Sequence, residues 1–320
     1  MINGMNKSFF EVLRAGINTT YQDLGRNNLY HFGIPFSGAM DRRNYLIANS
    51  LVDNQKNTST IEFAYQGPSL KFNGEEAYIS ITGNINFNIV RKDFKQEKGI
   101  CYQTYNLHNG DQIDILSTNK SVFGYLAVSG GFNTGLFWGS CSTNTKAKIG
   151  ANNGEKLKNG DKIFILNSKK KKINHKINYT NSSIEYIRVI KGTNYDYFSE
   201  NGKNIFFKNE FVVSKLSDRM GMRLEGPKIE NIINTNIRSE GLIKGVIQIP
   251  ADGNPIIMLS DHGTIGGYPK IGVVISADYD KLVQLSPNTK IKFKLIELNE
   301  AEKLFKLYKM ETDNLLNQIR

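Results

Sequence analysis

The chain alternates between short runs of β-branched and aromatic residues and bends rich in Gly, Asn and Asp. Such runs are typical of β-strands, because branched and aromatic side chains pack well on a pleated surface. Short strands at close spacing favour barrels or sandwiches over alternating strand and helix units. We therefore predict a mainly β fold, with strands that include 77–82, 112–116, 125–128, 162–166, 186–190, 245–249 and 290–295.

Two segments have helical periodicity instead. Residues 41–52 start at Asp41, a suitable N-cap, and carry apolar side chains at helical spacing. A second helix is predicted from Asn299 onward, with Glu302 three residues after the cap. We expect this terminal helix to pack on a barrel or on a partner. Its apolar face is predicted to contain Leu304, Leu307, Tyr308, Leu315 and Ile319.

A weak internal repeat links distant parts of the chain. "LHNGDQIDIL" at 107–116 and "LKNGDKIFIL" at 157–166 share a turn followed by a strand. "LSPNTKIKFKL" at 285–295 has the same outline without the Gly-Asp pair. One interpretation is two related halves; the other is that Asn-Gly-Asp simply starts hairpins well.

The strand pattern lapses once, in the lysine-rich stretch 168–183. We interpret this stretch as a solvated linker or hairpin tip, in which His175 has no special role; a basic tether for an acidic surface is the alternative. The chain is long enough for two domains. We predict a first β-barrel-type domain at 9–175, a second at 184–297, and a C-terminal helix at 298–320.

Composition excludes several classes of protein. The formal net charge is +11, but the lysines are scattered singly among Asn and Ile, so we predict no nucleic-acid partner. Cys101 and Cys141 form no CxxC motif, which argues against a zinc site or a disulfide framework. No signal-peptide pattern and no run of about 20 apolar residues is present, so we expect a cytoplasmic protein that does not bind membranes.

The common catalytic signatures GxxxxGK[ST], HExxH, GxSxG and GxGxxG are absent, and we expect no metal site. Candidate chemistry lies instead in polar bends. "TTYQDLGR" at 19–26 places Asp23 and Arg26 around a glycine turn, either to hold an anion or as a structural salt bridge. "GIPFSGAMD" at 33–41 runs through Ser37 into a helix start, which suits a carboxylate or phosphate; a simple capped turn is the alternative.

Two further bends lie in the second half of the chain. In "SDRMGMRLEGP" at 217–227, one arginine is expected to brace the loop while the other, Arg219 or Arg223, is a candidate anion ligand. In "DHGTIGGYP" at 261–269, three glycines predict left-handed turns or a close approach to the backbone. His262 or Tyr268 can exchange protons if held near a substrate, or can be ordinary satisfied polar groups.

Taken together, these blocks resemble one family. The order is QDLGR, then GIPFSGAMD, A-N-x-L-x-x-N at 48–54 and I-E-x-x-x-x-G-P-x-L-x-F at 61–72. It continues with YLAVxGG at 125–131, GSxST at 139–143, RMGxRLEGP, IQIPxDGxPII and GGYPKI at 266–271. The chain thus resembles, over residues 9–293, the carboxyltransferase A/B-type family, which includes the C subunit of bacterial 5-oxoprolinase, KipA and allophanate hydrolase subunit 2.

The resemblance implies two cyclophilin-like β-barrel domains with few helices. It also implies a hetero-oligomer with the KipI-like B subunit of 5-oxoprolinase, often with the A subunit too, which opens 5-oxoproline to glutamate using ATP with Mg²⁺ in the assembled complex. Related domains of urea carboxylase receive carboxybiotin, so a biotin-dependent carboxyltransferase component for urea or a similar amide is an alternative. A non-catalytic antagonist of a KipI-type kinase inhibitor is another.

A small planar amide is the common substrate that the family implies. Asp23, Asp261 and Tyr268 are then the candidate catalytic residues. The family commonly has an amide side chain just before Thr264, an arginine where Cys141 stands and another near Glu155, so the resemblance implies that a substrate contact or a bracing residue differs in this chain. We expect the bends to face one cleft with a main-chain floor. The candidate substrate-binding residues are Arg26, Ser37, Asp41, Arg219, Thr264, Gly266 and Gly267.

Overall fold

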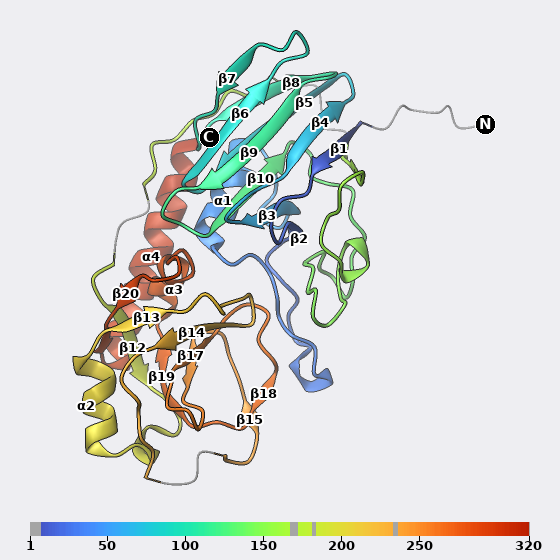
Figure 1. The fold of residues 1–320 in the computed structure, drawn as a ribbon. Helices are drawn as coiled ribbons and strands as arrows, with labels where there is room; N and C mark the ends of the chain where they lie inside the picture. The colour runs from blue at the N-terminus through green and yellow to red at the C-terminus, as the bar shows by residue number, and fades with distance from the viewer. Residues whose placement is uncertain (1–7, 167–171, 181–183, 233–235, 320) are drawn as a thin grey trace. The chain divides into compact units, whose positions relative to one another are not determined.

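The computed structural model describes residues 8–166, 172–180, 184–232 and 236–319 (Figure 1). Contacts divide the chain into two compact units. The first contains Met1–Arg26, Arg42–Thr180 and Asp313–Arg320, and the second contains Asn27–Asp41 and Asn181–Thr312. The inclusion of Asn27–Asp41 in the second unit was not predicted from the sequence.

The first unit consists of two antiparallel sheets around one core (Figure 1). The six-stranded sheet has the order β11-β1-β4-β9-β6-β7, and its strands are β1 (Phe9–Arg14), β4 (Ser69–Asn73), β6 (Ile85–Val90), β7 (Gln96–Lys98), β9 (Gln112–Thr118) and β11 (Lys162–Phe164). The five-stranded sheet has the order β2-β3-β10-β5-β8, and its strands are β2 (Thr20–Gln22), β3 (Thr60–Ala64), β5 (Glu76–Thr82), β8 (Thr104–His108) and β10 (Phe123–Val128).

Helix α1 (Arg42–Leu51) covers one face of β5. Ser80 and Thr82 donate side-chain hydrogen bonds of 2.6 and 2.8 Å to carbonyl oxygens of this helix. The other face of β5 enters the core, so the strand is buried on both sides after its first residue. This explains why 77–82 is a nearly continuous run of apolar and small polar residues.

The second unit contains an eight-stranded sheet in the order β20-β13-β14-β17-β16-β19-β12-β21. Its two end strands, β20 and β21, are separated along the chain only by Lys292. The sheet therefore closes on itself as a barrel. The remaining strands are β12 (Ile187–Lys191), β13 (Phe211–Val213), β14 (Gly221–Glu225), β16 (Val246–Gln248), β17 (Ile256–Met258) and β19 (Lys270–Val274), with β20 at Lys290–Ile291 and β21 at Phe293–Leu295.

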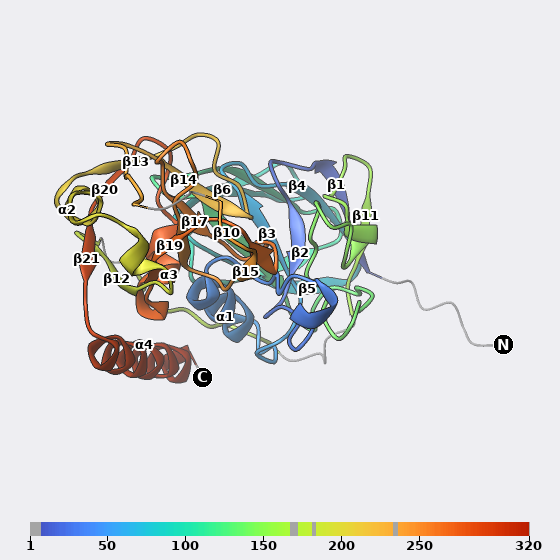
Figure 2. The same cartoon turned by 90° about the horizontal axis from the view of Figure 1, so that it is seen from below.

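Smaller elements complete the second unit. Strands β15 (Glu240–Gly241) and β18 (Ile265–Gly266) form a separate ribbon. The helices are α2 (Glu200–Lys208), α3 (Ser276–Val283) and the start of α4 (Leu298–Ile319), the long red helix in Figure 2. Short 3₁₀ turns occur at η1 (Tyr30–Phe32) and η3 (Tyr195–Tyr197), and in the first unit at η2 (Asn152–Gly154). The mainly β, barrel-forming fold class is thus confirmed.

The helices were predicted only in part. The predicted segments at 41–52 and from 299 onward are helical, but α2 and α3 were missed. Each has at most nine residues, which is too short for the helical spacing of apolar residues to be recognised in the sequence. In α4, Ala301, Leu304 and Tyr308 pack against buried residues of the second unit, whereas Leu307 is 51% exposed, so its place on the apolar face is wrong.

The described part of the lysine-rich stretch 168–183 is held by backbone hydrogen bonds. In residues 172–180, the His175 carbonyl accepts a hydrogen bond from Thr104 N, and Ile177 N donates to the Tyr102 carbonyl, both at 2.9 Å. Ile173 and Ile177 are buried. The solvated-linker interpretation is therefore wrong for these residues, because apolar side chains bury against the first unit; 168–171 and 181–183 lie outside the described residues.

The internal repeat marks one recurring turn. Each copy contains a four-residue turn, which starts at His108, Lys158 or Ser286. The N–H of the fourth turn residue donates to the carbonyl of the first, and the third turn residue has a positive φ. The N–H of the third turn residue donates to the carbonyl of a residue on a neighbouring strand. The N–H of that strand residue donates in turn to the carbonyl of the fourth turn residue. The third, fourth and strand residues are Gly110, Asp111 and Phe72; Gly160, Asp161 and Val12; and Asn288, Thr289 and Val213.

The hairpin explanation of the repeat is wrong for the first copy. The turn before β9 follows β8, but these two strands belong to different sheets. In the first two copies the aspartate side chain also closes the turn, with Oδ2 accepting from the first residue's N–H at 3.0 Å for Asp111 and 2.8 Å for Asp161. The repeated sequence therefore specifies a turn that forms backbone hydrogen bonds with a neighbouring strand.

Candidate functional site

The first unit contains a buried polar cluster centred on Asp23. Its Oδ1 accepts hydrogen bonds from Gly25 N at 2.8 Å and from the Ser140 and Ser142 hydroxyls at 2.6 Å each. Its Oδ2 accepts from Cys141 N at 2.7 Å. Because a carboxylate offers about four acceptor positions, these four donors use its capacity. Asp23 thus fixes the 140–142 segment.

Arg26 holds the same segment from its own side. Its Nη2 donates to the Ser142 carbonyl at 2.5 Å and its Nε to the Phe137 carbonyl at 3.5 Å. The guanidinium is buried, with the residue 2% exposed. Asp23 and Arg26 thus both bind residues of the 137–142 segment, and their roles toward an anion stay predictions. The sequence analysis gave no role to the two serines of GSCST, which supply two of the four donors to Asp23.

Both cysteines are free thiols, as predicted. Burial raises the pKa of Cys101 to about 11 and also raises that of Cys141, where the Asp23 carboxylate adds to the effect. A thiol with a raised pKa is a poor nucleophile at neutral pH, because little thiolate is present. Cys141 is therefore a packing residue of the Asp23 cluster.

The second unit contains a bidentate ion pair. Arg219 Nε donates to Asp261 Oδ2 at 2.8 Å, and Nη2 donates to Asp261 Oδ1 at 3.1 Å. The backbone N–H of Asp261 also donates to the Arg219 carbonyl. The two side chains are 12% and 4% exposed, so little water screens the pair. Arg219 is thus a bracing residue for the loop that starts at Asp261.

The same arginine reaches the bend before α1. Its Nη2 donates to the Gly38 carbonyl at 2.8 Å, and Ser37 N donates to the Ser260 carbonyl at 3.0 Å. Ser37 is buried and has a φ of 57°, a conformation that costs a non-glycine residue energy. Such strain occurs preferentially at functional sites. Three segments distant in sequence therefore meet here, and we call this group the Arg219–Asp261 site.

Asp41 lies at the end of this bend and is 1% exposed. Its Oδ2 accepts a hydrogen bond of 2.8 Å from Gln284 Nε2, just after α3. The predicted helix α1 begins at the next residue, Arg42. Asp41 is thus held within the second unit, and its role toward a substrate stays a prediction.

The glycine-rich loop is packed by the chain itself. None of Gly263, Gly266 and Gly267 has a positive φ, so the left-handed part of the prediction is wrong. The close approach is correct: a Cβ on Gly266 would lie 2.7 Å from Gln248 Nε2, and one on Gly267 would lie 3.1 Å from the Ile237 carbonyl oxygen. These glycines allow β18 and its neighbours to pack closely.

The end of this loop is tied down by two polar contacts. Gln248 Nε2 donates to the Tyr268 carbonyl at 3.1 Å, and Lys270 Nζ lies 2.8 Å from Glu240 Oε2. The hydrogen bond from Lys270 lowers the pKa of Glu240. The Tyr268 side chain is 38% exposed, and Thr264 accepts a backbone hydrogen bond from Leu242. The catalytic role of Tyr268 stays a prediction.

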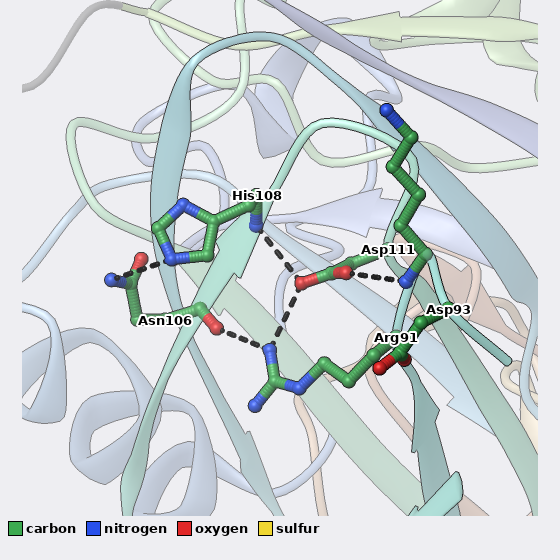
Figure 3. A pocket seen from close by; sticks show the side chains of 6 residues that line it. Arg91, Asp93, Asn106, His108 and Asp111 are labelled. Atoms are coloured by element: carbon green, nitrogen blue, oxygen red, sulfur yellow. Dashed lines mark hydrogen bonds and ion pairs between the residues drawn. The ribbon is translucent and has the colours of Figure 1, made fainter. Parts of the chain in front are cut away.

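An open pocket of about 640 Å³ lies on the first unit (Figure 3). It is lined by Arg91, Lys92, Asp93, Asn106, His108 and Asp111. At its base, Arg91 Nη1 donates to Asp111 Oδ2 at 2.9 Å, and the backbone N–H groups of Lys92 and His108 donate to the same carboxylate at 3.0 Å. These hydrogen bonds lower the pKa of Asp111, although burial opposes the shift. The network braces two turns against each other.

Two kinds of feature were searched for in the described residues: side-chain clusters that could bind a metal ion, and helices that could span a membrane. Across these parts of the chain, no group of three or more His, Cys, Asp or Glu residues is arranged to hold a metal ion. None of the helices in the described ranges combines the length and apolar character needed to cross a bilayer.

The family model "Carboxyltransferase domain, subdomain A and B" matches residues 32–295, so the chain belongs to this family. It is 32% identical over 311 residues to the C subunit of 5-oxoprolinase from Haemophilus influenzae, covering 97% of each chain. It is 31% identical to that of Escherichia coli, covering 92% of this chain and 93% of the relative.

The crystal structure of the K. lactis urea amidolyase contains a similar fold. It superposes with a TM-score of 0.86 at 26% identity and covers 98% of this chain. The chain spans only 20% of that protein, which therefore carries much more than this fold. The relatives thus include subunits of a multi-subunit enzyme and a region of a larger one.

Proposed function

We propose that this chain acts in the cytoplasm as the C subunit of an ATP-dependent 5-oxoprolinase, which opens 5-oxoproline to glutamate together with a KipI-like B subunit and an A subunit. The observation that carries this proposal is the similarity to two 5-oxoprolinase C subunits along nearly the whole of both chains. The urea-handling relative, in contrast, matches along a fifth of its length.

The Arg219–Asp261 site is our candidate for the place where the amide binds. Arg219 takes up two of the roughly four acceptor positions of the Asp261 carboxylate, and the others can accept a substrate N–H. The ion pair fixes the direction of that carboxylate, so little reorganisation is needed when the amide arrives. Asp23 and Arg26, whose groups bind the 137–142 segment, are proposed to position that segment rather than to react.

We assign no step of the reaction to ATP on this chain. ATP with Mg²⁺ is proposed to belong to the assembled complex. What the chain's own residues supply is orientation of a small amide and a rigid polar surface around it. The purified chain alone is therefore expected to be inactive.

The test is reconstitution. The chain is co-expressed with the B and A subunits, and glutamate and phosphate release are measured with 5-oxoproline and ATP. We expect release that depends on 5-oxoproline and disappears when this chain is left out. A complex that forms but releases no glutamate would overturn the proposal, and a complex without this chain that is fully active would also do so.

A second candidate is a carboxyltransferase component for urea or a similar amide. It is favoured by the TM-score of 0.86 to the urea amidolyase and by the carboxyltransferase family model. This function requires a biotinylated carrier. Streptavidin blotting of the native complex distinguishes the two: a biotinylated partner together with urea-dependent turnover would replace the first proposal.

A further inference from the structure

His262 lies beside the Arg219–Asp261 site and is 1% exposed. Its Nδ1 is 2.6 Å from the Gly263 carbonyl oxygen, and its Nε2 is 3.3 Å from the Tyr30 hydroxyl. The Tyr30 and His262 rings stack with an interplanar angle of 23° and a centroid separation of 6.0 Å. Tyr30 belongs to η1, in the segment Asn27–Asp41 that the second unit includes.

These contacts define the direction of both hydrogen bonds. A carbonyl oxygen can only accept, so Nδ1 carries the proton and donates to Gly263. In a neutral imidazole Nε2 is then the acceptor, and the Tyr30 hydroxyl donates to it. Burial lowers the pKa of His262 and so favours the neutral ring at pH 7; Lys244 acts in the same direction, while the Gly263 carbonyl and Asp261 oppose it.

The pair has one buried and one accessible end. His262 is enclosed, whereas the Tyr30 residue is 36% exposed, and burial of its phenol raises the pKa of Tyr30. A phenol that donates to a neutral imidazole is a strong hydrogen-bond acceptor and can lose its proton to the imidazole while receiving another. Asp261, the next residue to the imidazole, stabilises the imidazolium that forms.

We propose that Tyr30 and His262 form an acid–base pair for the amide bound at the Arg219–Asp261 site, with Tyr30 in contact with the substrate and His262 as the proton store. This inference rests on the proposed function. In the ring-opening step, which ATP hydrolysis drives in the assembled complex, water attacks the amide carbon; its proton passes to the Tyr30 oxygen while the phenol proton passes to His262 Nε2. When the C–N bond breaks, Tyr30 gives its proton to the leaving nitrogen and regains one from His262, so the pair ends unchanged.

The test compares variants in the reconstituted complex. Tyr30→Phe removes the hydroxyl and keeps the ring stacked, and His262→Gln removes the proton store. We expect each to lower kcat for 5-oxoproline about 100-fold with KM little changed. The wild-type rate should also fall at acidic pH, as His262 becomes charged at a pKa below its ordinary value, and this limb should vanish in His262→Gln.

His31→Gln is the matched control, because His31 is the exposed neighbour that contacts Phe32 instead. It should leave both kcat and the pH profile unchanged. A long-range ¹⁵N spectrum of the wild-type chain should show Nδ1 protonated in His262. Tyr30→Phe with wild-type kcat and an unchanged acidic limb overturns the pair while leaving the proposed function intact. An inactive wild-type complex rejects the proposed function and this inference with it.

Discussion

At the scale of single residues, buried polar groups hold the bends of this chain in place. Asp23 is the strongest case, because four donors converge on one carboxylate that is 1% exposed. Charge-assisted hydrogen bonds of this kind are about twice as strong as neutral ones. A buried carboxylate in this setting stabilises the fold only while every partner is present.

We expect Asp23→Asn to destabilise the first unit by about 2 kcal/mol, because an amide places NH₂ donors against the donors that now face the carboxylate. Denaturant unfolding followed by circular dichroism measures this loss. Asp313→Asn is the control, since Asp313 is 58% exposed and pairs with Lys56 at 3.6 Å. It should cost less than about 0.5 kcal/mol. Equal effects of the two substitutions would contradict the assignment.

The burial of His262 predicts a pH dependence of stability. Its pKa is lowered in the folded chain, so below an ordinary pKa of about 6.5 the unfolded state binds more protons. The stability contributed by neutral His262 is therefore present above that pH and is lost as the pH falls toward the folded pKa. Urea unfolding at pH 7 and pH 5 should show a smaller loss for His262→Gln than for the wild type. An identical loss would show that His262 contributes nothing.

At the scale of elements, the glycine-rich loop and the recurring turns need glycine for different reasons. Gly266 has an ordinary φ, and packing is what excludes a side chain there. Gly110 and Gly160 have φ of 94° and 86°, and backbone conformation is what excludes other residues. The two causes predict that these glycines tolerate different substitutions.

Gly266→Ala should destabilise the second unit by about 1–3 kcal/mol, because its Cβ would overlap Gln248 Nε2 and the Leu242 side chain. Gly263→Ala is the matched control on the same loop, where the nearest other atom is the Ile265 carbonyl oxygen at 3.5 Å. Thermal unfolding should leave it within about 0.5 kcal/mol of the wild type. A reversed order of the two variants would contradict the packing explanation.

The turns predict that asparagine can replace glycine. Gly160→Ala is expected to cost about 1 kcal/mol from its left-handed φ alone, because nothing lies within 4 Å of the new Cβ. Gly160→Asn should cost clearly less, since Asn288 occupies the equivalent position with a φ of 68°. Equal unfolding free energies for the two variants would count against a common turn.

The elements also show what the sequence could specify. Strands are predicted from runs of β-branched and aromatic residues, and long helices from the helical spacing of apolar residues. Both patterns are local in the sequence, so β5, β9, β10, α1 and α4 were predicted closely. The site was only partly predictable. Arg219 and Asp261 were each selected, but their mutual pairing depends on how β14 and β17 register, which no local pattern reports. Tyr30 was missed because a lone tyrosine in a polar loop carries no sequence signal.

At the scale of the molecule, each unit places a buried polar cluster at bends that the family motifs mark. The Asp23 cluster belongs to the first unit and the Arg219–Asp261 site to the second. The prediction that all the bends face one cleft is not tested by contacts within either unit. The proposed reaction requires only the second cluster to bind the amide directly.

The most direct test of this account compares two aspartates that flank the same strand, β17. Asp261 pairs with Arg219, whereas Asp252 only closes a local turn with Asn254. In the reconstituted complex, glutamate formation from 5-oxoproline should fall at least about 100-fold for Asp261→Asn and stay near the wild-type rate for Asp252→Asn. A fully active Asp261→Asn complex would contradict the account.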